Sequence, residues 1–286
     1  GATLVEVPAG VVVEEPLRYT VAGRGERALR HVVFRVGAGA QVTVVLRHEG
    51  LATYGAKIDL LVGDGASVTF VSIQDWADGA VHAGQTSLLI GRDAAVRTVE
   101  VSLGGTVVRL AGTARFAGPG GSLEQFGLYV ADAGQHLEHR LFVDHNEPHT
   151  RSLVDYRGAL QGAGAHSVWV GDVLIRKNAE GISTYEQNRN LVLTDGCTAD
   201  SVPNLEIETG EIVGAGHSST TGRFDDEQLF YLMSRGIGEA DAKRLVVEGF
   251  FADIVRRIGV PAVEERLLVA VREELARSVA APQGQR

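Results

Sequence analysis

One cysteine and one histidine lie in the stretch from Asn190 to Gly236, where strand-like sequence changes to helix-like sequence. Cys197 is the single cysteine of the chain, and His217 stands alone in the Gly-rich run GAGHSSTTG, which we interpret as a corner between the last strand and the helices. Thiolate and imidazole are both suitable ligands for iron. A free cysteine is otherwise often a buried apolar side chain, and an isolated turn histidine often has no special role. The residue types alone leave both interpretations open.

Four further histidines follow one another closely near the middle of the chain. His136 and His139 are an odd number of residues apart, so on one strand they face opposite sides and do not chelate together. His145 and His149 flank a corner that Pro148 predicts. We therefore assign none of these four histidines to a site.

Motifs for several enzymatic chemistries are missing from the sequence. GAGHSSTTG lacks the Gly-Lys pair of a nucleotide-binding P-loop, and neither G-x-S-x-G nor H-E-x-x-H occurs. A polysaccharide lyase or hydrolase would need paired carboxylates on one face. Asp155 and Asp172 are candidates for such a pair, but nothing around them singles them out.

The elements that position these residues are predicted by a repeat. Four Gly-led turns open similar strands, with GAGAQVTVVL from Gly37, GDGASVTFVSI from Gly63, GRDAAVRTVEV from Gly91 and GPGGSLEQFGLYV from Gly118. Successive turns are 26, 28 and 27 residues apart. Such a period is typical of a repeat architecture, in which each unit buries its apolar face against the next.

Each repeat unit contains two alternating strands. From Ala66 to Ser72, the side chains of Val68, Phe70 and Ser72 fall on one face. Second strands are expected at residues 57–62, 86–90 and 106–110, and the last coils at 191–193 and 205–207. Two strands and two turns in about 27 residues predict one coil of a right-handed parallel β-helix. An antiparallel sandwich is the alternative, although it does not require a recurring Gly-led corner.

The end of the chain is predicted to be helical, giving a mainly β protein with a β-helix core at 1–223 and a helical domain at 224–286. The first helix begins after Asp225 and ends at Gly236. The second, at about 239–258, has its apolar positions at Leu245, Val246, Phe250, Ile254 and Ile258. The third has an apolar stripe at Val263, Leu267, Val271, Leu275 and Val279.

Composition narrows the functional classes. The net charge of -9 and the lack of a Lys/Arg run argue against nucleic-acid binding. No apolar stretch reaches the 18 or so residues of a membrane span, and the first residues lack a charged signal region. A single cysteine fits a reducing compartment. We therefore expect a cytoplasmic protein without a membrane or nucleic-acid partner.

Several longer runs resemble one known family. YRGAL, NRNLVL, PNLEIETGEI, GRFDDEQLFYL and SRGI resemble the SufB/SufD proteins of iron-sulfur cluster assembly, and the SufD branch most of all. The resemblance covers about residues 5–276 and is densest over 145–249. The helical N-terminal region common in this family is expected to have no counterpart in this chain, which opens without Met.

The resemblance implies a scaffold subunit rather than an enzyme. Such a subunit pairs with a SufB-like partner through its last coils, and its helical end docks a SufC-like ABC ATPase. Nucleotide binding by that ATPase would rotate the two scaffold subunits and open their interface. A homodimer is expected when the partner is missing. The competing function is a β-helix carbohydrate-active enzyme or adhesin.

The resemblance also implies roles for the two candidate ligands. His217 falls on the position of a histidine that ligates a nascent cluster at the interface with the SufB-like partner. Cys197 lies close to the acceptor cysteine of the SufB-like branch, although another register places that cysteine nearer Thr194. Ser218 stands where the SufB-like branch has a glutamate. Two ligands are too few for a finished cluster, so we expect a transient iron-sulfur cluster shared with the partner and none tightly bound to the isolated chain.

Two further regions carry family-derived expectations. Gln74 and Trp76 resemble a Q-N-W run that is linked to sulfur passage in SufB-like proteins, and the alternative is a strand end with an aromatic plug. In DDEQLFYLMSRGI, we expect Leu229, Phe230 and Arg235 to contact the ATPase. Without the resemblance, this segment would be an ordinary cap on a repeat protein.

Overall fold

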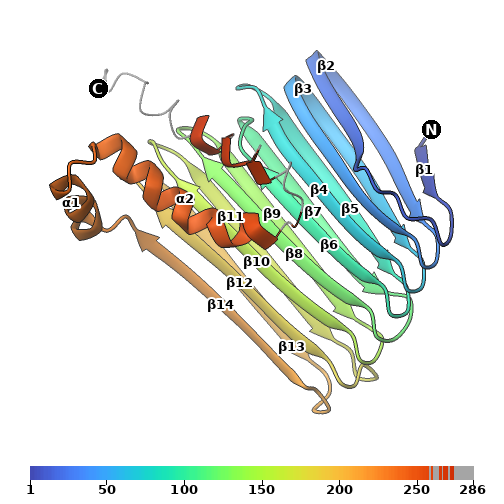
Figure 1. Cartoon of the computed structure of the whole chain (residues 1–286). Coiled ribbons are helices and arrows are strands. Elements are labelled where there is room, and N and C mark those ends of the chain that lie inside the picture. The colour runs from blue at the N-terminus through green and yellow to red at the C-terminus, as the bar shows by residue number, and fades with distance from the viewer. Residues whose placement is uncertain (258, 260–263, 266, 270, 274–286) are drawn as a thin grey trace.

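The computed structural model describes residues 1–257, 259, 264–265, 267–269 and 271–273. They form a parallel β-solenoid of about eight turns followed by a small helical region. Figure 1 shows the strands side by side along a flattened coil, with both helices near its later turns. The predicted parallel β-helix is confirmed. An antiparallel sandwich is excluded, because every pairing between the named strands is parallel.

The bounds of the elements show mostly ten-residue strands after two long ones. The strands are β1 (Thr3–Val7), β2 (Leu17–Val36), β3 (Gln41–Val62), β4 (Ser67–Trp76), β5 (Val81–Ile90), β6 (Ala95–Ser102), β7 (Val107–Phe116), β8 (Ser122–Ala131), β9 (His136–His145), β10 (Arg151–Leu160), β11 (His166–Ile175), β12 (Ser183–Val192), β13 (Thr198–Ile207) and β14 (Gly214–Arg223). The helices are α1 (Asp226–Ser234) and α2 (Glu239–Arg257).

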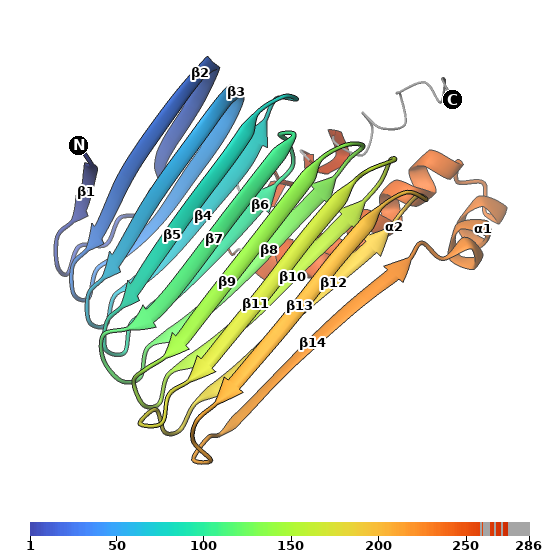
Figure 2. The ribbon, with the colours of Figure 1, turned by 180° about the vertical axis from the view of Figure 1, so that it is seen from behind.

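The solenoid has two faces that meet at the long strand β3. The strand order is β13-β11-β9-β7-β5-β3-β4-β6-β8-β10-β12-β14, so after β3 the odd-numbered strands form one face and the even-numbered strands the other. Figures 1 and 2 show α2 lying over the even-numbered face, with the odd-numbered strands on the opposite side. The two outermost strands, β13 and β14, form the C-terminal end of the solenoid.

The Gly-led turns form one stacked corner of the solenoid. Gly39, Gly65 and Gly120 adopt a left-handed backbone there, with φ between 64° and 77°, a conformation that costs glycine little. The turns also bond to one another, since the amide of Gly39 donates to the carbonyl of Asp64 at 2.8 Å. His149 occupies the same corner in a later coil, with φ 59° and a bond from its amide to the carbonyl of Glu180. It is therefore a corner residue.

Inward-facing side chains fill the lumen, by which we mean the space between the two faces. Val68, Phe70 and Ser72 are buried there, as the alternation on this strand predicts. Val71 points outward and is nevertheless fully buried, because the outer surface of the even-numbered face forms a second apolar cluster with the helical region.

The second cluster attaches α2 to the solenoid. Val247, Phe251 and Val255 follow one another every four residues and pack against outward side chains such as Phe126. The predicted apolar face of α2 is confirmed at Ile254, which is fully buried, and at Phe250, which packs against the cluster, but it is wrong at Leu245, which is 44% exposed. The side of α2 that is buried is the side that packs against the sheet, and the apolar spacing within the helix did not identify all of its residues.

The third predicted helix is described only in part. Leu267 and Val271 are helical and buried against the same cluster. The other predicted stripe positions, Val263, Leu275 and Val279, lie outside the described residues, as does Ile258 at the predicted end of the second helix. At the start of α1, the side chain of Asp225 accepts a hydrogen bond from the amide of Glu227 at 2.9 Å, the geometry of an N-cap.

Candidate functional site

The C-terminal end of the solenoid exposes both a sheet edge and the lumen. β13 and β14 are the last strands in the order, and within the described residues no strand pairs with their outer edges. Inward positions that are buried on β12 become exposed on β14: Asn188 is fully buried, whereas its register partner Ser219 is exposed. Side chains of β14 are therefore accessible to another molecule.

His217 lies on this end strand. The run GAGHSSTTG is part of the regular strand β14, so its interpretation as a corner is wrong. Gly and Ser are weak strand formers, but pairing with β12 supplies the hydrogen bonds that hold this run extended. His217 is the register partner of Glu186, and its Nδ1 lies 3.9 Å from Oε1 of that glutamate. The side chain of His217 is 45% exposed.

Glu186 is the buried half of this pair. It is 1% exposed, and neither carboxyl oxygen makes a regular hydrogen bond among the described residues. Burial, assisted by the negative charge of Asp172, raises the pKa of Glu186 to about 8, and the nearby backbone amide of Asn204 partly opposes this shift. At neutral pH the carboxyl of Glu186 is therefore largely protonated.

Glu186 is not among the residues predicted from the sequence, although the pattern around it contains a signal. In STYEQNRN, the alternate residues Thr184, Glu186, Asn188 and Asn190 are all polar, and all four point into the lumen. The inward register of this strand follows from the alternation of the preceding coils. A polar inward row near the end of a solenoid would have marked Glu186 as a candidate.

Cys197 lies in the turn between β12 and β13. Its thiol is half-buried against the lumenal core and donates a weak hydrogen bond to the carbonyl of Gly162 at 3.4 Å. Thr194 is in the same turn, with its Oγ1 3.6 Å from the sulfur. The two alternative registers for the acceptor cysteine therefore indicate one location.

One chain does not bring Cys197 and His217 together. On β14, His217 lies six residues before Arg223. Arg223 is the register partner of Val192, the last residue of β12, and the turn that contains Cys197 follows Val192. At about 3.3 Å per residue this separates the two side chains by roughly 20 Å along the strands. No set of three or more His, Cys, Asp or Glu residues in the described part of the chain could hold a metal ion. A metal site at either position needs ligands from elsewhere.

Gln74 lies in an inward row that reaches the open end. The row consists of Gln74, Ser102, Tyr129, Gly158, Asn190 and Thr221. The Ser102 hydroxyl donates to Gln74 at 3.4 Å, and the Tyr129 hydroxyl donates to Asn190 at 2.5 Å. The ring of His139, which comes from the opposite face, joins these segments: its Nε2 lies 3.0 Å from the Ser102 hydroxyl, and it stacks on Tyr129.

Trp76 has a different environment from Gln74. It is the last residue of β4, and its indole Nε1 donates to Nδ1 of His82 at 3.1 Å. The rings of His48, Tyr54 and His82 surround it. Burial lowers the pKa of His48 to about 4, and burial together with His48 lowers that of His82 to about 3. The local structure is therefore a neutral aromatic plug at a strand end.

The three residues expected to contact an ATPase lie on or directly after α1. Phe230 is 74% exposed, whereas Leu229 is partly buried. The guanidinium of Arg235 stacks over the ring of Tyr231 at 4.8 Å from its centroid. α1 thus presents aromatic surface to solvent beside α2.

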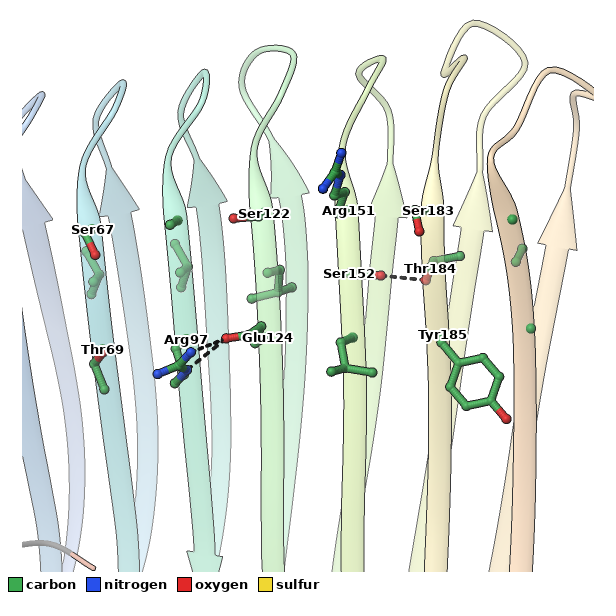
Figure 3. Close-up of a pocket in the computed structure, with 18 residues that line it drawn as sticks. Ser67, Thr69, Arg97, Ser122, Glu124, Arg151, Ser152, Ser183, Thr184 and Tyr185 are labelled. Carbon is green, nitrogen blue, oxygen red and sulfur yellow. Dashed lines mark hydrogen bonds and ion pairs between the residues drawn. The ribbon is translucent and has the colours of Figure 1, made fainter. Parts of the chain in front are cut away.

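A shallow groove of about 720 Å³ crosses the even-numbered face (Figure 3). Glu124 is the single carboxylate among its lining residues, and it is paired with Arg97. The other two carboxylates considered earlier do not meet: Asp155 is buried on β10 beside Arg157, while Asp172 lies on β11 and accepts from Asn204. The groove therefore lacks the pair of carboxylates that glycoside hydrolysis requires, and a carbohydrate-active enzyme is not favoured.

These features define a β-solenoid protein whose last strand presents a histidine at an open sheet edge. Residues 19–250 match the family model described as SUF system FeS cluster assembly, SufBD core domain. The chain therefore belongs to the SufBD family of iron-sulfur cluster assembly proteins. No helix formed by the described residues has the length and apolar character of a membrane span.

Individual relatives agree with this family. The iron-sulfur cluster assembly SufBD family protein Rv1462 of Mycobacterium tuberculosis is 56% identical over 282 residues, which cover 96% of this chain and 71% of the relative. SufB and SufD of Bacillus subtilis are each 24% identical over 96% of this chain, covering 60% and 64% of their own lengths. The two branches are equally distant by this measure.

Proposed function

We propose that this chain is a SufD-like scaffold subunit of the SUF system. It pairs with a SufB-like subunit through the β13–β14 end and carries a SufC-like ABC ATPase on its helical end. Ser218 supports the SufD branch, because the resemblance assigns a glutamate to this position in the SufB branch. In this role the protein acts in the cytoplasm, the compartment we expect for a chain with one cysteine.

The observation that carries this proposal is the position of His217 on an uncapped edge strand. An exposed strand edge offers unpaired backbone groups to another strand. A strand of the SufB-like partner that adds to β14 would lie next to His217 and bring its own ligands toward the same point. The nascent cluster, which is the cargo of the reaction, would then be held between two chains.

Glu186 gives the proposed site a means of balancing charge. Its carboxyl is protonated when the site is empty, and a cation bound at His217 would favour the ionised form. A metal ion at His217 would displace this proton to solvent, and the ionised carboxylate could then stabilise the metal or orient the imidazole. Cys197 is about 20 Å away on the same chain, so we assign it to a separate ligand position facing the partner.

The helical end supplies the second part of the proposal. The exposed ring of Phe230 and the neighbouring Leu229 and Arg235 form a surface suited to the ATPase. By the family resemblance, nucleotide binding there rotates the two scaffold subunits and opens their interface. α1 follows β14 after only two residues, Phe224 and Asp225, so force applied to α1 acts directly on the strand that carries His217.

The decisive experiment is anaerobic coexpression of this chain with its SufB-like partner and the ATPase, followed by measurement of iron and sulfide. His217→Ala should lower iron while the three subunits still copurify. His31→Ala is the matched control, because it removes another partly exposed strand histidine, one on β2 far from the open end. Cys197→Ala and Thr194→Ala test the turn in the same way.

Each outcome separates the parts of the proposal. An intact complex with unchanged iron in His217→Ala would contradict the ligand role and leave an architectural subunit. Failure of the subunits to copurify would contradict the scaffold role itself. A homodimer of the isolated chain that dissociates when the SufB-like subunit is added would support pairing through the same end, since both partners would compete for it.

A further inference from the structure

A second pair of histidines lies on the outer surface of the odd-numbered face. His136 opens β9 and His166 opens β11, and the two residues are register partners on adjacent strands. Their Nδ1 atoms are 3.2 Å apart, and the rings meet edge to face. The spacing of histidines within one strand gave no hint of this pair, because it forms across two coils.

Each ring is held by a carboxylate at its other nitrogen. Nε2 of His136 lies 3.3 Å from Oε2 of Glu138, and Nε2 of His166 lies 2.8 Å from Oδ2 of Asp200. An ionised carboxylate only accepts hydrogen bonds, so each Nε2 carries the proton when the ring is neutral. Both Nδ1 atoms then present lone pairs to each other, and either a bound metal ion or an added proton between them would relieve the repulsion.

The geometry of the two Nδ1 atoms fits a divalent transition metal. With metal–nitrogen bonds of about 2.1 Å, two nitrogens at this separation subtend about 100° at the metal, close to the tetrahedral angle. A histidine ligand typically donates its second ring nitrogen to a carboxylate, and both members of this pair do so. The two supporting carboxylates are thus already in place.

The surroundings leave the pair open to solvent and nearly neutral. The side chains of His136 and His166 are 32% and 36% exposed. Arg109 and Arg140 both pair with Glu138, so their charges exceed that of this carboxylate, while Asp200 adds a further negative charge. No cationic side chain among the described residues is recorded in contact with either ring. A metal ion can therefore reach the pair.

We propose that His136 and His166 form a surface binding site for a divalent cation of the zinc class. The pair supplies two imidazole ligands, Glu138 and Asp200 fix the ring orientations, and water or another molecule completes the coordination. The site is on the outer surface of β9 and β11, whereas His217 lies on β14 of the even-numbered face. Cys197 directly precedes Thr198, the register partner of His166, but its thiol packs against the lumenal core.

The competing explanation is a shared proton. If one ring is protonated at both nitrogens, it donates to the other across the same 3.2 Å. Such a pair needs no metal and would bind zinc no better than a single surface histidine. The two explanations differ in a titration, because only the metal site requires both rings for tight binding.

The test is isothermal titration of the untagged, metal-free chain with Zn²⁺ at pH 7.5. A Cys197→Ser, His217→Ala background removes the other candidate ligands. We expect one equivalent of Zn²⁺ to bind, and His136→Ala or His166→Ala to weaken that binding at least tenfold. Asp200→Asn keeps both ligands and should weaken binding by about tenfold, the lower end of the effect of removing a supporting carboxylate.

His31→Ala is the matched control for this site. His31 is also a strand histidine held by a carboxylate, with Nε2 2.6 Å from Oδ2 of Asp59 and a side chain 38% exposed, but no second imidazole from the described residues contacts it. Binding should be unchanged in this variant. Equal loss in His31→Ala, unchanged affinity in His166→Ala, or no zinc binding in the background chain would each overturn the proposal. Thermal melting of every variant checks that the solenoid stays folded.

Discussion

Gly158 on β10 lies directly beside the ring of Tyr129 on β8, and a β-carbon added to this glycine would overlap that ring. The arrangement is repeated in reverse on the same two strands, where Gly127 leaves space for the ring of Tyr156. The hydroxyl of Tyr129 in turn contacts Asn188 and Asn190. The two glycines therefore set the position of the polar row that reaches the open end.

Gly158→Ala should destabilise the solenoid by about 1–3 kcal/mol, the usual range for overpacking a filled core. The measurement is the midpoint of urea unfolding. Gly222→Ala on β14 is the matched control, since a β-carbon there would meet open space. Equal midpoints for the two variants would show that the Tyr129 ring moves aside without cost.

Arg157→Leu should loosen α2 from the even-numbered face. The buried guanidinium of Arg157 donates to the backbone carbonyl of Phe250 at 2.6 Å and lies beside the fully buried Asp155. Leucine would leave Asp155 without its partner, at a cost of about 3 kcal/mol or more. Adding Asp155→Leu should recover much of this loss, and urea unfolding of the single and double variants measures it. No recovery in the double variant would contradict the account.

His82→Gln should reduce the sensitivity of the protein to acid. His82 is neutral in the folded state because burial lowers its pKa to about 3. The unfolded chain binds a proton below about pH 6.5, so the stability that His82 contributes is complete above that pH and is lost as the pH falls. Relative to the glutamine variant, wild type should lose about 2.5 kcal/mol between pH 7 and pH 4.5. Parallel pH curves would argue against this assignment.

Glu186→Gln should make the folded protein more stable than wild type at alkaline pH. The pKa of Glu186 is raised to about 8, so the folded state keeps a proton that the unfolded chain releases above about pH 4.5. The stability linked to this proton is present at low pH and is lost as the pH rises through 8. Relative to wild type, the glutamine variant should gain up to about 5 kcal/mol between pH 4.5 and pH 9. Glu206→Gln, at an exposed site on β13, should show no such gain.

Phe230→Ser should weaken copurification of the ATPase without changing the melting of the isolated chain. The ring is largely exposed, so its removal costs the fold little, whereas an aromatic residue at the centre of an interface typically contributes 2 kcal/mol or more. Leu29→Ser on β2 is the control, because this exposed side chain lies far from the helical end. Equal ATPase recovery in both variants would count against the proposed docking surface.

The solenoid could be predicted from the sequence, because each of its corners is formed by residues that are adjacent in the chain. Each Gly-led turn needs a left-handed residue at a fixed place, so Gly39 and Gly65 leave a readable signal. The alternation on β4 likewise defined its inward face. The end strand was missed for a physical reason, since β14 has no large apolar residue and is held extended by its neighbour.

The contacts between coils could not be predicted from spacing alone. Register partners are 28 residues apart at Ser67 and Ala95 but 32 apart at Arg151 and Ser183. The repeat lengthens in its corners, so the partner of a given residue depends on turns whose length the sequence pattern does not fix. The pairing of His136 with His166 and of Glu186 with His217 became visible only once this register was known.

The composition of β14 affects how strongly its exposed edge can bind another chain. A regular strand edge rich in Val or Ile would recruit any extended chain and begin a fibril. β14 instead reads GAGHSSTTGR, and its side chains add little adhesion to whatever hydrogen bonds to it. The β14 edge therefore favours an incoming strand that matches it along its whole length, and it has less tendency to start aggregation than an edge rich in Val or Ile would have.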